Sequence, residues 1–208
     1  MRNHVVRTAV GFALALAGMT GLAHAQTPAA GGQPAAGAAA AAGSSAVANP
    51  TYVSFTLEEN VNKPAAEVWK RVGKYCDIAE WLQIAAGCTI TSGKDGEFGA
   101  VRSVAREILV GKTELSYTYT QPVAAGRPYN MYHGTLEARP VTATTSKLVY
   151  TIFWDNSMLA DDAAKEKDKA SRMATFQRAI QNMKTLAEGG TLPPPAQRGA
   201  APAGRGGN

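Results

Sequence analysis

The feature that most constrains the fold is an extended segment that runs directly into a proline. Residues 51–62 read as a β-strand, and Pro64 follows at a point where its missing N–H suits the first turn of a helix. Ala65, Val68, Trp69 and Val72 then recur at helical spacing. The sequence therefore predicts a strand and a short helix that starts at the proline.

Two further motifs follow in a fixed order. A short segment carries Trp81-Leu82, and a later strand starts with Gly99-Ala100-Val101-Arg102. Over residues 51–188 this order resembles the START-like helix-grip (SRPBCC) superfamily, which includes the polyketide cyclase/dehydrase and lipid-transport family, the birch pollen allergen and the plant abscisic acid receptors. The resemblance implies an α+β helix-grip fold, in which a curved antiparallel sheet of six to seven strands wraps around a long C-terminal helix. It also implies an internal cavity for an apolar small molecule.

The N-terminus has the pattern of a secretory signal peptide over residues 1–25. Arg2 and Arg7 precede an apolar run at 9–22, and Ala23-His24-Ala25 forms a small-x-small cleavage site before Gln26. The run has 14 residues, whereas a bilayer-spanning helix needs about 20. We therefore expect a periplasmic or secreted protein without stable membrane insertion, and an uncleaved anchor is the alternative.

Composition divides the rest of the chain. Residues 26–50 and 189–208 are rich in Ala, Gly and Pro and poor in aromatic residues, which predicts a disordered linker and a disordered tail. The remaining 51–188 segment is long enough for one domain. It holds 17 Lys and Arg against 16 Asp and Glu, so four of the five net positive charges lie in the ends of the chain. The domain lacks the basic excess of a nucleic-acid binder.

Patterning within the domain predicts mostly strands. Strands are expected at 51–61, 87–92, 98–109, 113–121, 129–139 and 147–155, and helices at 64–74, 77–84 and 160–188. The last helix has an apolar stripe of Met173, Phe176, Ile180, Met183 and Ala187. Such a stripe is usually ordinary core, and the resemblance makes it the lid of the cavity.

Strand alternation selects candidate wall residues for that cavity. In 129–139 the buried face carries Tyr132, Gly134 and Leu136, and Gly134 leaves space beside Tyr132. The other candidates are Trp81, Val104, Tyr117, Tyr119, Tyr150, Trp154, Phe176 and Ile180. Several of these rings carry a hydroxyl or an N–H, which suits a pocket that holds an apolar body and fixes a few polar points. The alternative is a core in which some hydroxyls only reach the rim.

Arg102 is the one charged candidate in this set. The resemblance would turn Arg102 inward, where its guanidinium could meet a carboxylate or carbonyl of a ligand. In the alternative it is an exposed strand residue that pairs with Glu97 or Glu107. As one unbroken strand, 98–109 would place Arg102, Val104 and Arg106 on one face and Glu107 on the other.

Residues for familiar catalytic chemistry are not apparent. The one histidine outside the predicted signal, His133, falls on the outer face of its strand, and no nucleophile elbow, phosphate-binding loop or zinc motif occurs. We therefore expect no catalytic group, no metal site and no cofactor. Cys76 and Cys88 are even in number and close in sequence, which predicts a disulfide in an exported protein, with two buried thiols as the alternative.

Three functions fit these features. The first is an exported binder or carrier of a small apolar, aromatic or lipid-like ligand. The second is an enzyme of the polyketide cyclase/dehydrase type, in which shape and orientation supply most of the catalysis. The third is a cell-envelope interaction module, whose protein partners the sequence leaves open.

The predicted processing can be tested on protein exported from a bacterial host. N-terminal sequencing should find Gln26 at the mature end, because cleavage is expected after Ala25. Limited proteolysis should leave a resistant core near 51–188. Rapid cutting inside 98–155 would contradict the single domain.

Overall fold

The computed structural model describes residue 47 and residues 49–195. The predicted signal peptide 1–25, nearly all of the linker 26–50 and most of the tail 189–208 lie outside these residues. Within the described part, seven strands form one antiparallel sheet in the order β1-β7-β6-β5-β4-β3-β2. The elements are β1 (Tyr52–Val61), α1 (Ala65–Val72), α2 (Ile78–Trp81), β2 (Ile90–Ser92), β3 (Val101–Arg102), β4 (Glu107–Lys112), β5 (Ser116–Thr120), β6 (Asn130–Pro140), β7 (Ser146–Asp155) and α3 (Asp162–Ala187).

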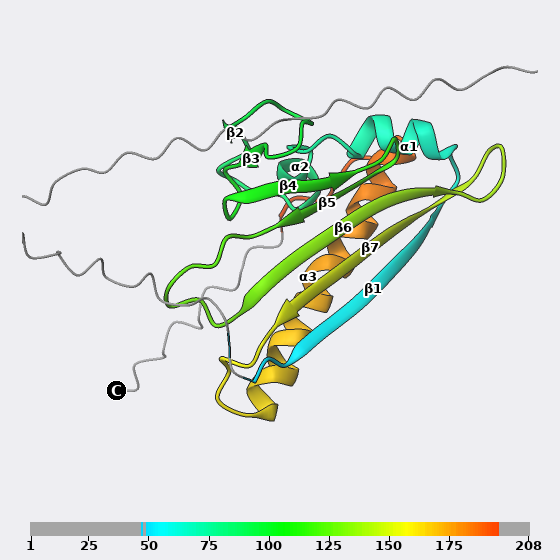
Figure 1. Cartoon of the computed structure of the whole chain (residues 1–208). Coiled ribbons are helices and arrows are strands. Elements are labelled where there is room, and N and C mark those ends of the chain that lie inside the picture. The colour runs from blue at the N-terminus through cyan, green and yellow to red at the C-terminus, as the bar shows by residue number, and fades with distance from the viewer. Residues whose placement is uncertain (1–46, 48, 196–208) are drawn as a thin grey trace, which may run out of the picture. The chain divides into compact units, whose positions relative to one another are not determined.

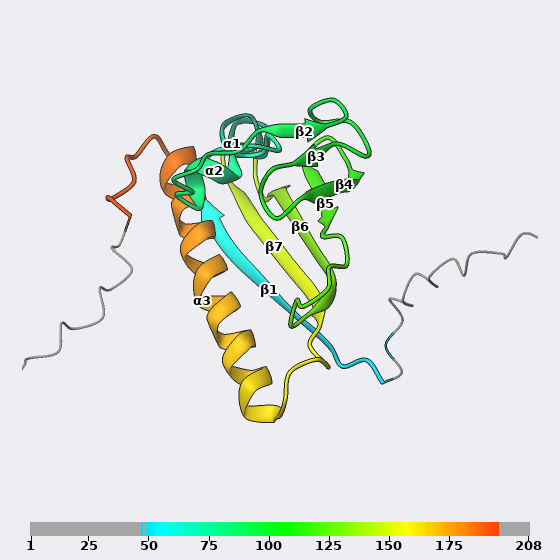
Figure 2. The ribbon, with the colours of Figure 1, turned by 90° about the vertical axis from the view of Figure 1, so that its left-hand side faces the viewer.

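The sheet is curved, and α3 runs along one of its faces with α1 and α2 near the C-terminal end of α3 (Figures 1 and 2). This is the α+β helix-grip arrangement that the resemblance implies. The long strands β1, β7 and β6 pair in continuous antiparallel register over most of their length. Along β6 the buried residues alternate with less buried ones from Tyr132 to Ala138, as its sequence predicts. The inner face of the sheet and α3 together form the core.

The first turn of α1 follows Pro64, whose carbonyl accepts a hydrogen bond from the Val68 N–H at 3.1 Å. Ala65, Val68 and Val72 form the buried face of α1. The chain then leads to the short α2, and a disulfide joins Cys76 to Cys88, as the sequence predicts. The bridge therefore ties the start of α2 to the segment that enters β2.

The long helix α3 is capped by Asp161, whose side chain accepts a hydrogen bond from the Ala164 N–H at 2.8 Å. All of its buried residues lie in its second half: Phe176, Ala179, Ile180, Met183 and Leu186. Met173, which the stripe assigned to the core, is exposed. The first half of α3 contacts the sheet through a hydrogen bond, in which the Trp154 indole N–H donates to Asp168 at 3.0 Å.

The predicted single strand 98–109 is wrong. The chain reverses between β3 and β4, and the Glu107 N–H donates to the Val104 carbonyl at 3.1 Å. Ala105 and Arg106 both have positive φ, of 51° and 57°, as the two central residues of a type I′ turn require. The turn places Arg102 directly opposite Glu107 and leaves Arg106 exposed.

Two observations concern the ends of the described chain. Past the expected domain end at residue 188, Leu192 packs against the core and the Pro193 carbonyl accepts a hydrogen bond from Gln83 at 2.6 Å. No helix in the described part of the chain is both long and apolar enough to span a membrane.

The disulfide gives a prediction about stability. Replacing Cys76 and Cys88 by serine should lower the free energy of unfolding by about 3 kcal/mol, because the bridge restricts the unfolded chain over a separation of 12 residues. Thermal denaturation should show a fall in the melting temperature of about 10 °C. Reduction of the unaltered protein should have the same effect, and reductant should leave the serine variant unchanged. Two titratable thiols in denatured, unreduced protein would rule out the bridge.

Candidate binding site at the mouth of the grip

The predicted wall residues gather on the inner face of the fold. All of them except Val104 and Gly134 are large side chains that are almost completely buried: Trp81, Arg102, Tyr117, Tyr119, Tyr132, Leu136, Tyr150, Trp154, Phe176 and Ile180. The rings of Tyr150 and Phe176 meet edge to face at 4.9 Å, and those of Trp81 and Tyr150 at 6.1 Å. The interior between the sheet and α3, which we call the grip, is thus filled by aromatic rings that contact one another.

Gly134 has a steric role in this packing. A Cβ at this position would overlap the ring and hydroxyl of Tyr119 on the neighbouring strand β5. The space that Gly134 leaves is therefore taken by the Tyr119 side chain. In that position the Tyr119 and Tyr150 hydroxyls form a hydrogen bond of 2.8 Å.

Arg102 points inward and forms a buried ion pair with Glu107. The Arg102 Nε donates to Glu107 Oε2 at 2.7 Å, and Arg102 Nη2 lies 2.5 Å from the same oxygen. Nη1 donates to the Tyr75 carbonyl at 2.5 Å. The guanidinium also lies 4.3 Å from the ring centroid of Tyr75 and 4.7 Å from that of Tyr119. The pair combines features of both sequence hypotheses, since Arg102 is buried and Glu107 is its partner.

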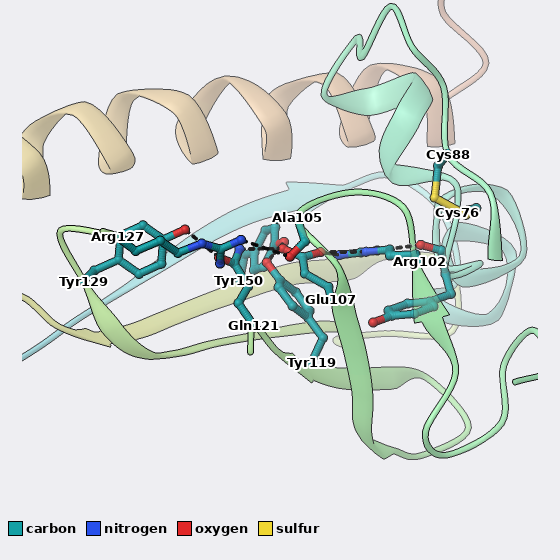
Figure 3. A network of polar contacts seen from close by, with 11 residues as sticks. Cys76, Cys88, Arg102, Ala105, Glu107, Tyr119, Gln121, Arg127, Tyr129 and Tyr150 are labelled. Atoms are coloured by element: carbon teal, nitrogen blue, oxygen red, sulfur yellow. Dashed lines mark hydrogen bonds and ion pairs between the residues drawn. A yellow bond between two sulfur atoms is a disulfide. The ribbon is translucent and has the colours of Figure 1, made fainter. Parts of the chain in front are cut away.

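A chain of polar contacts leads outward from this pair (Figure 3). The Gln121 amide donates to Glu107 Oε1 at 2.9 Å. Gln121 in turn accepts hydrogen bonds from Arg127 at 2.9 Å and from the Tyr129 hydroxyl at 2.6 Å. Both oxygens of the buried Glu107 carboxylate thus have partners. The hydrogen bonds through Gln121 connect this carboxylate to the loop between β5 and β6.

A hollow of about 300 Å³ opens beside this chain, between the β3–β4 turn, α2 and the middle of α3. We call it the mouth. Its apolar lining is Ile78, Leu82, Val104, Tyr119, Tyr132 and Phe176, and its polar lining includes Glu107, Gln121, Ser171, Arg172 and Thr175. Of the candidates from the sequence, Val104, Tyr119, Tyr132 and Phe176 therefore line the mouth, and most of the others form the packed core behind it.

Burial sets the protonation of the groups at the mouth. Burial raises the pKa of Glu107 above its usual range, while the Arg102 charge and the hydrogen bond from Gln121 act in the opposite direction. Burial also raises the pKa of Tyr119 and Tyr132, so both rings carry a neutral hydroxyl. The mouth offers an ion pair in its wall and neutral hydroxyls beside it.

The polar residues at the mouth were not identified from the sequence. Strand alternation alone puts Glu107 on the opposite face from Arg102, because the pattern does not reveal the β3–β4 turn. Gln121 ends the predicted strand 113–121 in the phase of Tyr117 and Tyr119, so alternation does point it inward, although it is polar and lies just beyond the end of the observed β5. Arg172 is held by Asp168, with its Nε 3.0 Å from both carboxylate oxygens. The four-residue spacing of these two on α3 is the one signal that could have indicated the ion pair.

The packing of Gly134 gives a prediction. Gly134→Ala should destabilise the protein by about 1–3 kcal/mol, because the added methyl group displaces the Tyr119 ring and breaks its bond to Tyr150. Chemical denaturation measures the loss. Gly111→Ala on β4 is the matched control, since its Cβ would lie 3.3 Å from Thr118 and should cost less. In a Tyr119→Leu background the Gly134→Ala loss should fall by more than half. An equal loss in both backgrounds would contradict the steric role.

Known structures share this architecture. A protein from Thermobifida fusca is 22% identical, with a TM-score of 0.54, and the match covers 64% of this chain and 92% of that one. The Zhui aromatase/cyclase from Streptomyces sp. R1128 is 18% identical, with a TM-score of 0.52 and coverage of 68% and 100%. A truncated norcoclaurine synthase from Thalictrum flavum is 11% identical, with a TM-score of 0.50 and coverage of 70% and 99%. At these identities the likeness concerns the fold.

Sequence comparison is more specific. No curated protein matches the chain closely enough to count as a relative. The family model described as polyketide cyclase/dehydrase and lipid transport matches residues 52–188, which is nearly the whole described domain. The chain therefore belongs to the polyketide cyclase/dehydrase and lipid transport family.

Proposed function

We propose that the protein is an exported binder or carrier of a small apolar or aromatic molecule, which it holds at the mouth. The observation that carries this proposal is the composition of that hollow. Its aromatic lining of Tyr119, Tyr132 and Phe176 is accompanied by a few polar side chains, which come from the sheet and from α3. Binding sites for small molecules combine mainly apolar walls with a few placed polar groups, in volumes from about 300 Å³ upward.

The polar edge limits what can bind. Arg172, which lines the mouth, is already paired with Asp168, and Arg102 lies buried behind its partner Glu107, so neither arginine offers an unpaired charge to a ligand carboxylate. A neutral molecule with one or two hydroxyl or carbonyl groups can instead use Gln121, Ser171 and Thr175 at the rim. We therefore expect an apolar or aromatic ligand with few polar atoms.

Export is part of the proposal. The apolar N-terminal run and its small-residue cleavage site support it. The Cys76–Cys88 disulfide is consistent with it, because disulfides persist in oxidising compartments such as the periplasm.

An enzyme of the cyclase or dehydratase type is the second candidate, and Glu107 favours it. This carboxyl lines the mouth, its pKa is raised by burial, and it lies within the same hollow as two neutral tyrosines. A carboxyl in such a place can accept or donate a proton beside a bound substrate. The match in fold to an aromatase/cyclase is consistent with this reading.

Native mass spectrometry of protein isolated from the periplasm, together with titration of the neutral dye N-phenyl-1-naphthylamine, tests the binder. Ser171→Trp should weaken dye binding at least tenfold, because the indole would fill the mouth. Ala170→Trp is the matched control, since Ala170 is also exposed on α3 but does not line the mouth. Absence of both dye binding and a co-purified molecule would refute the binder, and equal binding by both variants would place the ligand elsewhere.

Glu107→Gln separates the two candidates. The amide keeps the shape of the side chain but leaves the buried Arg102 charge unpaired, so the variant is compared only under conditions where its melting curve shows it folded. A folded carrier should then retain its co-purified molecule unchanged in mass. An enzyme should convert that molecule only when Glu107 is intact.

A further inference from the structure

A second hollow lies on the other side of the Arg102–Glu107 pair. It has a volume of about 450 Å³ and lies between the end of α1, the β4–β5 hairpin and the loop at Asp95 and Gly96. Its floor is made of Trp69, Tyr75, Leu109 and Tyr117. We call it the α1 pocket. It shares no lining residue with the mouth, because Arg102 and the rings of Tyr75 and Tyr119 stacked on it lie between the two.

The floor of the α1 pocket is a continuous aromatic surface. The ring centroids of Trp69 and Tyr117 are 5.6 Å apart, and those of Tyr75 and Tyr117 are 5.5 Å apart. Trp69 is held against Gly73, where a Cβ would overlap the indole. Gly73 therefore fixes the position of a half-buried tryptophan at the edge of the pocket. A planar ring can stack on such a surface.

The rim of the α1 pocket carries cations that lack ionic partners. Lys70, Lys74 and Lys112 line it, all three are exposed, and none forms an ion pair within the described part of the chain. Lys70 lies in the last turn of α1, and Lys74 follows directly after the C-cap Gly73. Lys112 is directed by a hydrogen bond of 2.5 Å to the Gly96 carbonyl. Asp95 and Glu114 also line the rim, which leaves an excess of one positive charge.

A buried polar atom at the floor lacks a partner. The side-chain hydroxyl of Tyr75 has no hydrogen bond among the described residues, although the residue is only 3% exposed. Buried polar groups in native proteins are nearly always hydrogen-bonded. Tyr75, which forms part of the floor, therefore has unused hydrogen-bonding capacity.

We propose that the α1 pocket is a second binding site, specific for a planar aromatic anion such as an aromatic carboxylate or sulfonate. The ring of the ligand stacks on Trp69 and Tyr117. Its anionic group lies at Lys70 and Lys74, whose ammonium groups form no ion pair among the described residues. This site differs from the mouth in chemistry, since the arginine that lines the mouth, Arg172, is already paired with Asp168 and the mouth suits neutral ligands.

Binding of naphthalene-2-sulfonate, measured by calorimetry and by the chemical shift of the Trp69 indole N–H, tests the proposal. The indole signal is assigned with Trp69→Phe. The unaltered protein should bind the sulfonate at least tenfold more tightly than neutral 2-naphthalenemethanol. The variant Lys70→Gln/Lys74→Gln should bind it at least tenfold more weakly than the unaltered protein, and the affinity should fall with added salt.

Two controls make the result specific. Lys147→Gln/Lys167→Gln removes the same charge away from the α1 pocket and should leave binding unchanged. Ser171→Trp blocks the mouth and should also leave it unchanged, so failure of the α1 pocket and failure of the mouth can be told apart. The proposal is overturned by any of three results: the sulfonate does not bind, its affinity is unchanged in Lys70→Gln/Lys74→Gln, or Ser171→Trp abolishes its binding.

Discussion

The buried ion pair between Arg102 and Glu107 is the interaction on which the interior depends. Two charges removed from water carry a large desolvation cost, and loss of one partner typically destabilises a protein by about 3–5 kcal/mol. Here the cost is offset by the Gln121 amide, the Tyr75 carbonyl and the rings on either side of the guanidinium. The pair therefore fixes the β3–β4 hairpin, the chain that precedes α2 and the end of β5 relative to one another.

The rings behind the pair determine how much free space the grip retains. Gly134 allows Tyr119 to lie across β6 and reach Tyr150, and Tyr150 in turn meets Phe176 on α3. Burial raises the pKa of Tyr119 and Tyr150 well above the usual value, so their hydroxyls act as neutral hydrogen-bonding groups. As a result, the interior between the sheet and α3 is packed, and the mouth and the α1 pocket are hollows at its periphery.

The sequence predicts the fold better than it predicts the site, and the β3–β4 hairpin explains why. Long strands such as β6 alternate clearly, so their inner residues could be assigned from the pattern alone. The turn at Val104-Ala105-Arg106 contains no glycine, asparagine or aspartate, although two of its residues have positive φ. Without that turn, Glu107 falls on the wrong face. The inward direction of Arg102 followed only from the family resemblance.

The position of the ion pair also explains why the two hollows differ in chemistry. Glu107 occupies the side of Arg102 that faces the mouth, so the guanidinium offers little charge to a ligand there. On the other side, Tyr75 covers the guanidinium, and the cations available to a ligand are the lysines of the rim. Tyr75 is followed directly by Cys76, so the disulfide holds the wall between the hollows in place. One buried pair thus separates a neutral site from a cationic one within a single small domain.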